Sequence, residues 1–367
     1  MMSVRDHLAH LIAAEGPLSI AEFMRTALTA PGLGYYMRGD PFGAEGDFVT
    51  APDISQIFGE LIGLWSVATW AALGAPPRFS LVELGPGRGT LMSDALRAAR
   101  VRPAFLEAAN VALIEIGPAL RARQRQTLKD ARVGSLAWFE TVDEALVADR
   151  PLILVANEFF DALPVRQFVA TDRGWCERCV GLAGDGTFAF ARSLAPIPDD
   201  LIPRAICAAP QGSVFEFAPA RNALAKDIAE HLARRRGAAL VIDYGFSGPG
   251  VGDTLQAVKA HGFVPVLDDP GHADLTTHVD FDALATGFAA GGADVYGPLE
   301  QSAFLQRLGA RERTDALAAG ATGVGRAVVE AGFARLTEPA QMGSLFKTLV
   351  AASPGLPPPG FVPHERR

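Results

Sequence analysis

The feature that most constrains the fold is a glycine-rich turn placed between an apolar run and a helical pattern. Residues 80–92 read Ser-Leu-Val-Glu-Leu-Gly-Pro-Gly-Arg-Gly-Thr-Leu-Met, so a buried strand is followed at once by Gly85, Gly87 and Gly89. Glycines allow the backbone to approach a ligand closely, and the free N–H groups at the start of the next helix attract a carboxylate or a phosphate. The turn therefore predicts a site for an anionic or polar ligand.

The spacing of the glycines narrows the choice of ligand. A dinucleotide-binding turn needs the pattern G-x-G-x-x-G/A, but Thr90 occupies the sixth position here and the third glycine comes one residue early. The run Glu83-x-Gly85-x-Gly87-x-Gly89 instead resembles the first motif of class I S-adenosylmethionine methyltransferases, in which the turn packs against the methionine part of the cofactor. The alternative is a structural glycine turn in another α/β protein.

Apolar runs and helical segments alternate along the rest of the chain. This alternation predicts a mostly parallel sheet with helices on both faces, and so a Rossmann-like α/β fold. Period-two patterns from 165 to 217 predict a β-rich insertion between the fourth and fifth strands, and the segment 244–280 is rich in loop residues. The expected strands of the sheet are 81–85, 110–116, 136–139, 151–156 and 238–243, followed by 294–296 and 344–350.

Three parts are expected along the chain. Residues 1–77 read as a helical N-terminal cap. Within the cap, residues 39–53 form a long loop rich in glycine, aspartate and proline, which suggests a lid because long loops in compact domains are usually functional. Residues 78–352 form the core with its β-rich insertion, and residues 353–367, with five prolines, form a mobile tail.

Polar residues follow two of the expected strands, at the edge where ligands bind in sheets of this kind. Glu115 lies at the end of the second strand, and a carboxylate there can accept hydrogen bonds from both ribose hydroxyls of an adenosine. Asn157, Glu158 and Asp161 follow the fourth strand, which places two acids and an amide where the methyl group of the cofactor would point. The alternative is a helix start with Asn157 as its N-cap, since acids also favour that end of a helix.

Other reactive residues carry weaker signals. His278 lies in a loop beyond the fifth strand and is a candidate catalytic residue, although a lone histidine in a loop is more often a hydrogen-bonding residue. Cys176 and Cys179 form a C-x-x-C pair, but no second pair follows and both fall in an expected strand. The sequence therefore predicts neither a metal site nor a disulfide framework.

The charge of the chain disfavours some partners. The 367 residues include 41 acidic and 33 basic residues, a net charge of −8, which argues against a duplex nucleic acid and is compatible with a cationic substrate. No apolar run is long enough to span a membrane, and the first residues lack the pattern of a signal peptide or a mitochondrial transit peptide. We therefore expect a cytoplasmic protein, and the oligomeric state stays open.

Four motifs in the same order resemble those of the MidA-like family, the mitochondrial complex I assembly-factor methyltransferases, which have many bacterial members. The family pattern has Thr-Ser-Pro-Glu where this chain has Thr-Ala-Pro-Asp at 50–53, and the resemblance covers roughly residues 5–350. The motifs are GDFVTAPDISQIFG at 46–59, ELGPGRGT at 83–90, NEFFDALP at 157–164 and DLTTHVD at 274–280.

The resemblance implies a class I fold, S-adenosylmethionine as methyl donor and an arginine in a protein as acceptor. It also implies a link to the assembly of respiratory complex I, with a complex I subunit or its bacterial equivalent as partner. It adds Thr50 to the expected cofactor-binding residues, which are then Glu83, Gly85, Gly87, Gly89, Glu115, Asn157 and Thr50.

A guanidinium keeps its proton at neutral pH because its pKa lies above about 12. We therefore expect Glu158 and Asp161 to hold its N–H groups, aim one nitrogen at the methyl group and stabilise the charge developing there, with Asn157 between cofactor and substrate. Two other functions stay open: a small-molecule methyltransferase of the same fold, and an assembly chaperone without enzymatic activity that keeps the cofactor-binding fold. Thr90 disfavours a nicotinamide oxidoreductase.

Overall fold

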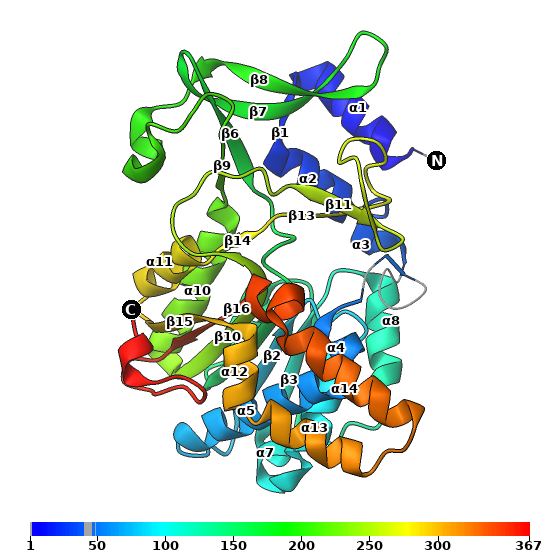
Figure 1. The fold of residues 1–367 in the computed structure, drawn as a ribbon, viewed down its shortest axis with the longest axis vertical. Coiled ribbons are helices and arrows are strands. Elements are labelled where there is room, and N and C mark those ends of the chain that lie inside the picture. Colours follow the sequence, from blue (N-terminus) through cyan, green and yellow to red (C-terminus); the bar gives the residue numbers. More distant parts are fainter. Residues whose placement is uncertain (1, 40–45, 48) are drawn as a thin grey trace.

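The computed structural model describes residues 2–39, 46–47 and 49–367, and within this part of the chain the centre is an eight-stranded sheet (Figure 1). Seven strands lie in the order β15-β16-β10-β5-β2-β3-β4, with β16 antiparallel to both neighbours, and β14 (Val279–Asp280) pairs with β10. The expected Rossmann-like α/β fold is confirmed. The seven strands are β2 (Phe79–Leu84), β3 (Ala109–Ile114), β4 (Ser135–Phe139), β5 (Leu152–Asn157), β10 (Gly237–Phe246), β15 (Asp294–Glu300) and β16 (Phe346–Ala352).

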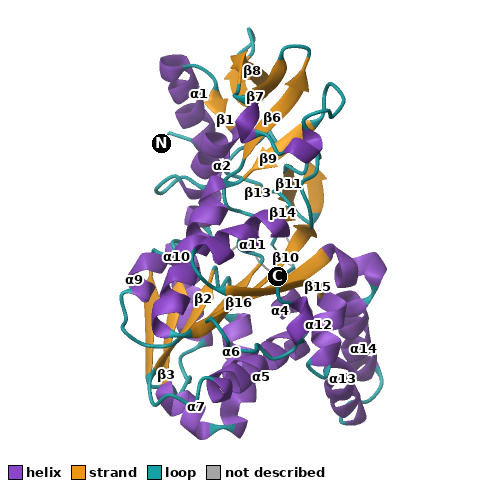
Figure 2. Ribbon diagram, turned by 90° about the vertical axis from the view of Figure 1, so that its left-hand side faces the viewer, coloured by secondary structure: helices purple, strands orange, loops and turns teal. Residues whose placement is uncertain are grey.

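Helices cover both faces of this sheet because its strands are apolar on both sides. Along β2, for example, Leu81 packs into the core on one face and Val82 into the core on the other. One face is covered by α5 (Gln56–Ala72), α6 (Thr90–Ala98), α7 (Pro103–Ala108), α12 (Gln301–Arg307), α13 (Ala310–Ala319) and α14 (Val324–Thr337). The other face is covered by α9 (Val142–Leu146), α10 (Pro219–Arg235) and α11 (Phe281–Ala290), while α8 (Pro118–Thr127) follows β3 (Figure 2).

A second lobe, which we call the β-rich lobe, comprises residues 2–38, 165–218 and 254–278 and lies above the central sheet in Figure 1. Its strands form two sheets of their own and do not extend the central one. The first sheet contains β1 (Leu18–Ser19), β6 (Arg166–Thr171), β7 (Gly174–Leu182), β8 (Phe188–Pro196) and β9 (Val214–Phe217). The second contains β11 (Gln256–Lys259), β12 (Gly262–Val264) and β13 (Asp274–Thr276).

The helices expected as one cap over residues 1–77 divide between the two lobes. The first three, α1 (Val4–Glu15), α2 (Ile20–Thr29) and α3 (Tyr35–Arg38), belong to the β-rich lobe, where Phe23 shares a core with Val180 of β7. By contrast, α5 packs against the sheet and α6, with Trp65 in that core. The structure therefore differs from the expected cap, because helical periodicity shows that a face is buried but not which element covers it.

The tail over residues 353–367 also differs from the expectation, since it is packed. The indole N–H of Trp65 donates a hydrogen bond of 3.1 Å to the carbonyl of Pro359, and the ring of Phe361 lies 5.6 Å from that of Phe304. Prolines prevent a regular helix or strand here, but they leave carbonyl groups and apolar rings free to find partners.

The loop expected to act as a lid, residues 39–53, lies partly outside the described residues, which omit 40–45 and 48. The short helix α4 (Ala51–Ile54) stands at its end. Across the described ranges, no helix combines the length and the apolar character needed to cross a membrane. Short turns of other helical types occur at Ala99–Val101, Asp199–Leu201, Arg204–Ile206, Pro339–Gly343 and Pro363–Glu365.

Candidate active site

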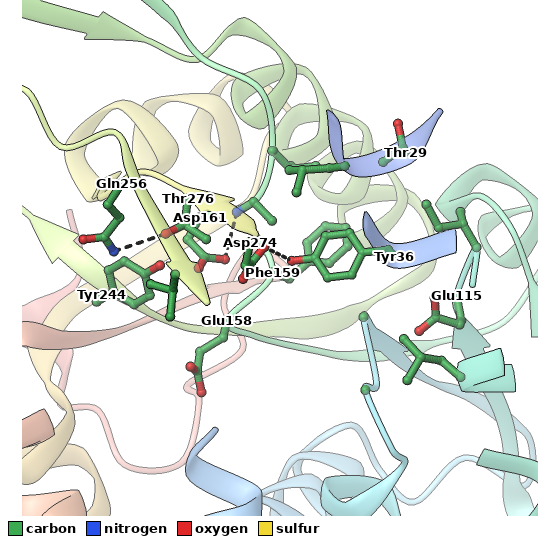
Figure 3. Close-up of a pocket in the computed structure, with 18 of the residues that line it drawn as sticks. Thr29, Tyr36, Glu115, Glu158, Phe159, Asp161, Tyr244, Gln256, Asp274 and Thr276 are labelled. Atoms are coloured by element: carbon green, nitrogen blue, oxygen red, sulfur yellow. Dashed lines mark hydrogen bonds between the residues drawn. The ribbon is translucent and has the colours of Figure 1, made fainter. Parts of the chain in front are cut away.

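A cavity of about 720 Å³ lies where the central sheet meets the β-rich lobe (Figure 3). The sheet contributes the residues at the carboxyl ends of three strands: Glu115 after β3, Gly85 and Gly87 after β2, and Glu158 after β5. The β-rich lobe contributes the opposite wall, which includes Asp274 of β13. The cavity thus brings together residues predicted from separate strands, and adds residues from a lobe far away in the sequence.

The glycine turn has a conformation that other residues rarely adopt. Gly85 and Gly87 have φ angles of 58° and 52°, in the left-handed region that favours glycine. A Cβ atom at Gly85 would also lie 2.9 Å from the ring of Phe159. Gly89 is the N-cap of α6 and lines neither the large cavity nor the smaller pocket beside it. At Gly85 and Gly87, the first two glycines of the turn, the cavity is therefore lined by backbone atoms without a side chain.

A smaller pocket of about 40 Å³ shares the glycine turn with the large cavity and is lined by Thr50, Glu83 and Asn157, among others. The Oε2 atom of Glu83 and the Oδ1 atom of Asn157 are buried there and have no hydrogen-bond partner among the described residues. Burial raises the pKa of Glu83 to about 8. Buried acceptors without partners are costly, so this pocket fits a ligand that brings hydrogen-bond donors, such as an ammonium group.

Glu115 lies at the β3 end of the large cavity and is held in place by its neighbours. Its carboxylate accepts hydrogen bonds from the N–H of Gly117 (2.7 Å) and the side-chain amide of Gln124 (3.1 Å). The same amide donates to the carbonyl of Gly87 at 2.7 Å, which ties the carboxylate to the glycine turn. Burial raises the pKa of Glu115 to about 6, against the effect of these hydrogen bonds. A carboxylate fixed beside the turn fits the expected role of accepting hydrogen bonds from the ribose hydroxyl groups of the cofactor.

The segment after β5 is a turn, and the alternative of a helix start at Asn157 is wrong. Residues 158–165 form no helix, and Glu158 has a φ angle of 49°, in the left-handed region that residues other than glycine rarely adopt. Its carboxylate accepts hydrogen bonds from the N–H of Ala51 (3.2 Å) and the amide of Asn157 (3.1 Å). Burial and the nearby charge of Asp161 raise the pKa of Glu158 to about 7. The backbone therefore aims this carboxyl group into the cavity.

Asp243, in the second half of β10, shapes that turn. One oxygen of its buried carboxylate accepts the N–H groups of Phe159, Phe160 and Asp161 at 3.0–3.2 Å. The other oxygen accepts the N–H of Tyr244 at 2.9 Å. The sequence places Asp243 at a strand end, which is a signal for a functional position, but we did not assign it a role. It acts as a positioning residue for the two acids after β5.

Arg221 of α10 is a second residue that the sequence did not single out, because nothing in a helix marks such a position. Its guanidinium is buried and donates to the carbonyls of Asp161 (3.0 Å) and His278 (2.9 Å) and to the hydroxyl of Thr277 (2.5 Å). Burial lowers the pKa of Arg221. One side chain thereby ties the turn after β5 to the segment after β13.

The β-rich lobe adds a third carboxylate to the cavity. Asp274 is buried, and its Oδ1 atom accepts a hydrogen bond of 2.8 Å from the hydroxyl of Tyr36 on α3 (Figure 3). Burial, followed by the charge of Asp161, raises the pKa of Asp274 to about 7. Asp274 stands in the expected DLTTHVD motif, but only the packing of α3 and β13 against the sheet brings it near Glu158. The cavity therefore holds three carboxyl groups in its middle.

His278 does line the cavity, in an aromatic row that leads away from the acids. Its ring lies 5.5 Å from that of Tyr244, which in turn lies 5.4 Å from the ring of Phe346 on β16. Burial and then the charge of Arg221 lower the pKa of His278. The imidazole is therefore neutral near pH 7 and can accept a proton.

The cysteines lie away from this site and form no metal centre. Cys176 and Cys179 are buried in β7, Cys207 is exposed, and all three are free thiols. Over the described ranges, no group of histidine, cysteine, aspartate and glutamate residues could hold a metal ion. The polar side chains that line the cavity include carboxyl groups, an imidazole and hydroxyl groups.

Comparison with known proteins agrees with this geometry. Residues 61–299 match the family described as "Putative S-adenosyl-L-methionine-dependent methyltransferase". A relative from Drosophila melanogaster, named protein arginine methyltransferase NDUFAF7 homolog, mitochondrial, is 37% identical over 96% of this chain and 85% of its own. The protein arginine methyltransferase NDUFAF7 of Danio rerio is 35% identical over 94% of this chain and 86% of its own.

A solved structure supports the same assignment. It is a COG1565 superfamily member from Burkholderia thailandensis bound to S-adenosyl-homocysteine, with a TM-score of 0.86 and 28% identity, covering 99% of this chain and 95% of its own. A second structure of such a protein from the same organism has a TM-score of 0.83 and 29% identity, with the same coverage. The unpartnered acceptors beside the glycine turn and the carboxylate at the β3 end fit the same cofactor. The chain therefore belongs to the family of S-adenosyl-L-methionine-dependent methyltransferases.

Proposed function

We propose that this methyltransferase transfers a methyl group to a guanidinium nitrogen of an arginine in a protein. The observation that carries the proposal is the set of three carboxyl groups, Glu158, Asp161 and Asp274, in the middle of the cavity. Carboxylates are the natural acceptors for the planar fork of guanidinium N–H groups. Among the described residues that line the cavity, Arg335 is the only one with a permanent positive charge, and it is exposed. The names of the relatives support the same acceptor.

We assign the cofactor to the β2 and β3 end of the site. Its ammonium group meets the unpartnered oxygens of Glu83 and Asn157, and its ribose meets Glu115. The left-handed glycines leave room for the methionine part of the cofactor. The full set of cofactor-binding residues in this proposal is Glu83, Gly85, Gly87, Gly89, Glu115, Asn157 and Thr50.

When bound, S-adenosyl-L-methionine supplies a methyl group that is already activated by its sulfonium sulfur. The task of the chain is to align the acceptor nitrogen, an effect worth up to ~7–11 kcal/mol. Glu158 and Asp161 hold the guanidinium and aim one nitrogen, and Asn157 lies between the acceptor and the cofactor. The nitrogen that takes the methyl group gives up one proton, for which the cavity offers the carboxylates that hold the guanidinium and, further along its wall, the imidazole of His278.

For the acceptor protein, we propose a subunit of respiratory complex I or its bacterial equivalent, on the strength of the motif resemblance. The two rival functions are a small-molecule methyltransferase and an assembly chaperone without activity. The names of the relatives favour a protein acceptor over a small molecule.

The test is to incubate the purified protein with methyl-labelled S-adenosyl-L-methionine and an extract of cells that lack it, and to hydrolyse the labelled products. Label in methylarginine from one protein band supports the proposal and identifies the acceptor. Label in small molecules alone supports the first rival. Binding of the methyl donor without any transfer supports the chaperone.

Two variants test whether the acids after β5 hold the acceptor or bind the cofactor. Glu158→Gln and Asp161→Asn should each lower the rate of methyl transfer at least tenfold while leaving the affinity for S-adenosyl-L-methionine nearly unchanged. Asp227→Asn, an exposed acid of α10 outside the cavity, is the matched control and should keep the full rate. Loss of cofactor affinity in the first two variants would instead place those acids in the cofactor site.

A further inference from the structure

The cavity has two ends, and the order of the strands tells which end faces the acceptor. The lining residues follow the strands of the sheet: Glu115 after β3, Gly87 after β2, Glu158 after β5, Tyr244 on β10 and Phe346 on β16. In the proposed function, on which this inference rests, the cofactor occupies the β2 and β3 end. The acceptor therefore reaches the carboxyl groups from the β10 and β16 end.

Arg335 also lines the cavity. It lies in the last turn of α14, which packs on α4, and the short turn Pro339–Gly343 leads from there to the start of β16. Leu345, which is 44% exposed and directly precedes β16, lines the cavity as well. The edge of the cavity on this side is thus basic and apolar, whereas the middle is acidic.

The side chain of Arg335 is also available for a partner. It is exposed and has no ion pair or hydrogen bond within the described part of the chain. By contrast, Arg307 pairs with Glu365 at 2.8 Å and Arg313 with Glu60 at 2.6 Å. Arg335 does not line the smaller pocket at Glu83, so the methionine end of the cofactor is not its partner.

We propose that Arg335 selects acceptor segments that carry an acidic residue close to the target arginine, with an apolar residue against Leu345. The acidic middle of the cavity attracts any cationic side chain, so it cannot by itself distinguish one arginine from another. A second basic residue in the segment would meet Arg335 and be repelled, whereas an aspartate or glutamate would pair with it. The enzyme would then prefer an isolated arginine in a mixed segment over an arginine-rich one.

The test compares peptides that share one central arginine and one neighbouring leucine and differ only in having aspartate, glycine or lysine close to the arginine. Transfer rates are measured with the full chain, with Arg335→Glu and with Arg335→Gln. Arg326→Glu is the matched control, because Arg326 is another exposed arginine of α14 that does not line the cavity. Peptide affinity in the presence of S-adenosyl-homocysteine gives a second readout that does not depend on turnover.

The wild-type protein should prefer the aspartate peptide over the glycine peptide by about two- to fivefold, the range expected for a solvent-exposed ion pair, and the preference should shrink at high salt. Arg335→Gln should abolish the preference, and Arg335→Glu should reverse it in favour of lysine, mainly through KM. Arg326→Glu should keep the wild-type order.

An unchanged order of peptides in Arg335→Glu, in both rate and affinity, would overturn the inference while leaving the proposed function intact. Equal methylation of all peptides by the wild-type protein would also overturn the inference about Arg335 and leave the proposed function intact. A folded protein that binds S-adenosyl-L-methionine but neither binds nor methylates any arginine peptide would overturn the proposed function, and the inference with it.

Discussion

Replacing Glu83 with glutamine should change how the stability of the protein depends on pH. Glu83 is 3% exposed, its Oε2 atom has no hydrogen-bond partner in the described part of the chain, and burial raises its pKa from 4.5 to about 8. In the unfolded chain the same group ionises near its ordinary pKa. Between these two pH values, the folded protein therefore keeps a proton that the unfolded chain has lost.

Because the folded state binds more protons there, the free energy of unfolding falls as the pH rises through this window. Each pH unit corresponds to about 1.36 kcal/mol, so Glu83 removes about 3 kcal/mol of stability between pH 5 and pH 7. The loss begins above pH 4.5 and is complete above about pH 8. Glutamine does not ionise, so the Glu83→Gln variant keeps that stability. Other titrating groups are present in both proteins and cancel in the difference.

The measurement is urea unfolding of the wild type and the variant, without cofactor, at pH 5, 7 and 9. The control is Glu60→Gln, because Glu60 is similarly buried but its carboxylate accepts hydrogen bonds of 2.6 Å from both Arg97 and Arg313. Removing that charge should lower the stability at neutral pH by about 1–3 kcal/mol. The two variants therefore shift stability at neutral pH in opposite directions.

A difference between wild type and Glu83→Gln that stays constant from pH 5 to pH 9 would refute the reasoning, because it would mean that Glu83 ionises as freely in the folded protein as in the unfolded chain. The variant should also bind S-adenosyl-L-methionine at least tenfold more weakly, as measured by calorimetry. A gain in stability together with a loss of affinity would identify Glu83 as a residue kept for the ligand at the expense of the fold.

Three further predictions concern the cavity and its supports. The value of kcat/KM should rise as the pH increases through about 7, because the carboxyl groups of Glu158 and Asp274 ionise there and only their charged forms hold a guanidinium. A flat pH profile of the wild type would contradict this, and so would a profile that Asp274→Asn leaves unchanged. Gly85→Ala should lower the free energy of unfolding by about 1–3 kcal/mol in thermal unfolding, because Gly85 has a positive φ and the new methyl group would meet the ring of Phe159. Unchanged stability and cofactor affinity would show that the turn can relax. Asp243→Asn should cost roughly 3 kcal/mol in urea unfolding and lower the transfer rate, because an amide has one acceptor oxygen where the carboxyl group has two, so either the N–H groups of the turn after β5 or that of Tyr244 lose their acceptor. A variant with wild-type stability would contradict that role.

The strand ends that hold the candidate site residues could be predicted from the sequence, because each is marked by a local sequence pattern. The glycine turn after β2 and the acids after β3 and β5 each follow an apolar run, and parallel strands bring such ends to one edge of a sheet. The confirmed fold class followed from the same alternation. The roles of the individual residues at those ends remain predictions.

The residues that escaped prediction depend on contacts between distant parts of the chain. Asp274 and Tyr36 are separated by 238 positions and meet only because the β-rich lobe closes over the sheet. The helix start considered at Asn157 failed for a similar reason. The chain turns at Glu158 with a positive φ, and its next three N–H groups bond to the carboxyl group of Asp243, more than 80 positions away, which no local pattern indicates.

The position of β16 has a consequence for how the protein is made. This strand lies between β10 and β15, yet it is synthesised after both of them, and it carries Phe346 at one wall of the cavity. A nascent chain that has not yet emerged past residue 352 exposes two open sheet edges where this strand belongs. Such edges invite pairing with other chains, so the growing polypeptide depends on rapid completion or on chaperones. The methyl-transfer site therefore cannot be complete until β16 has joined the sheet, and an unfinished chain cannot act on its acceptor.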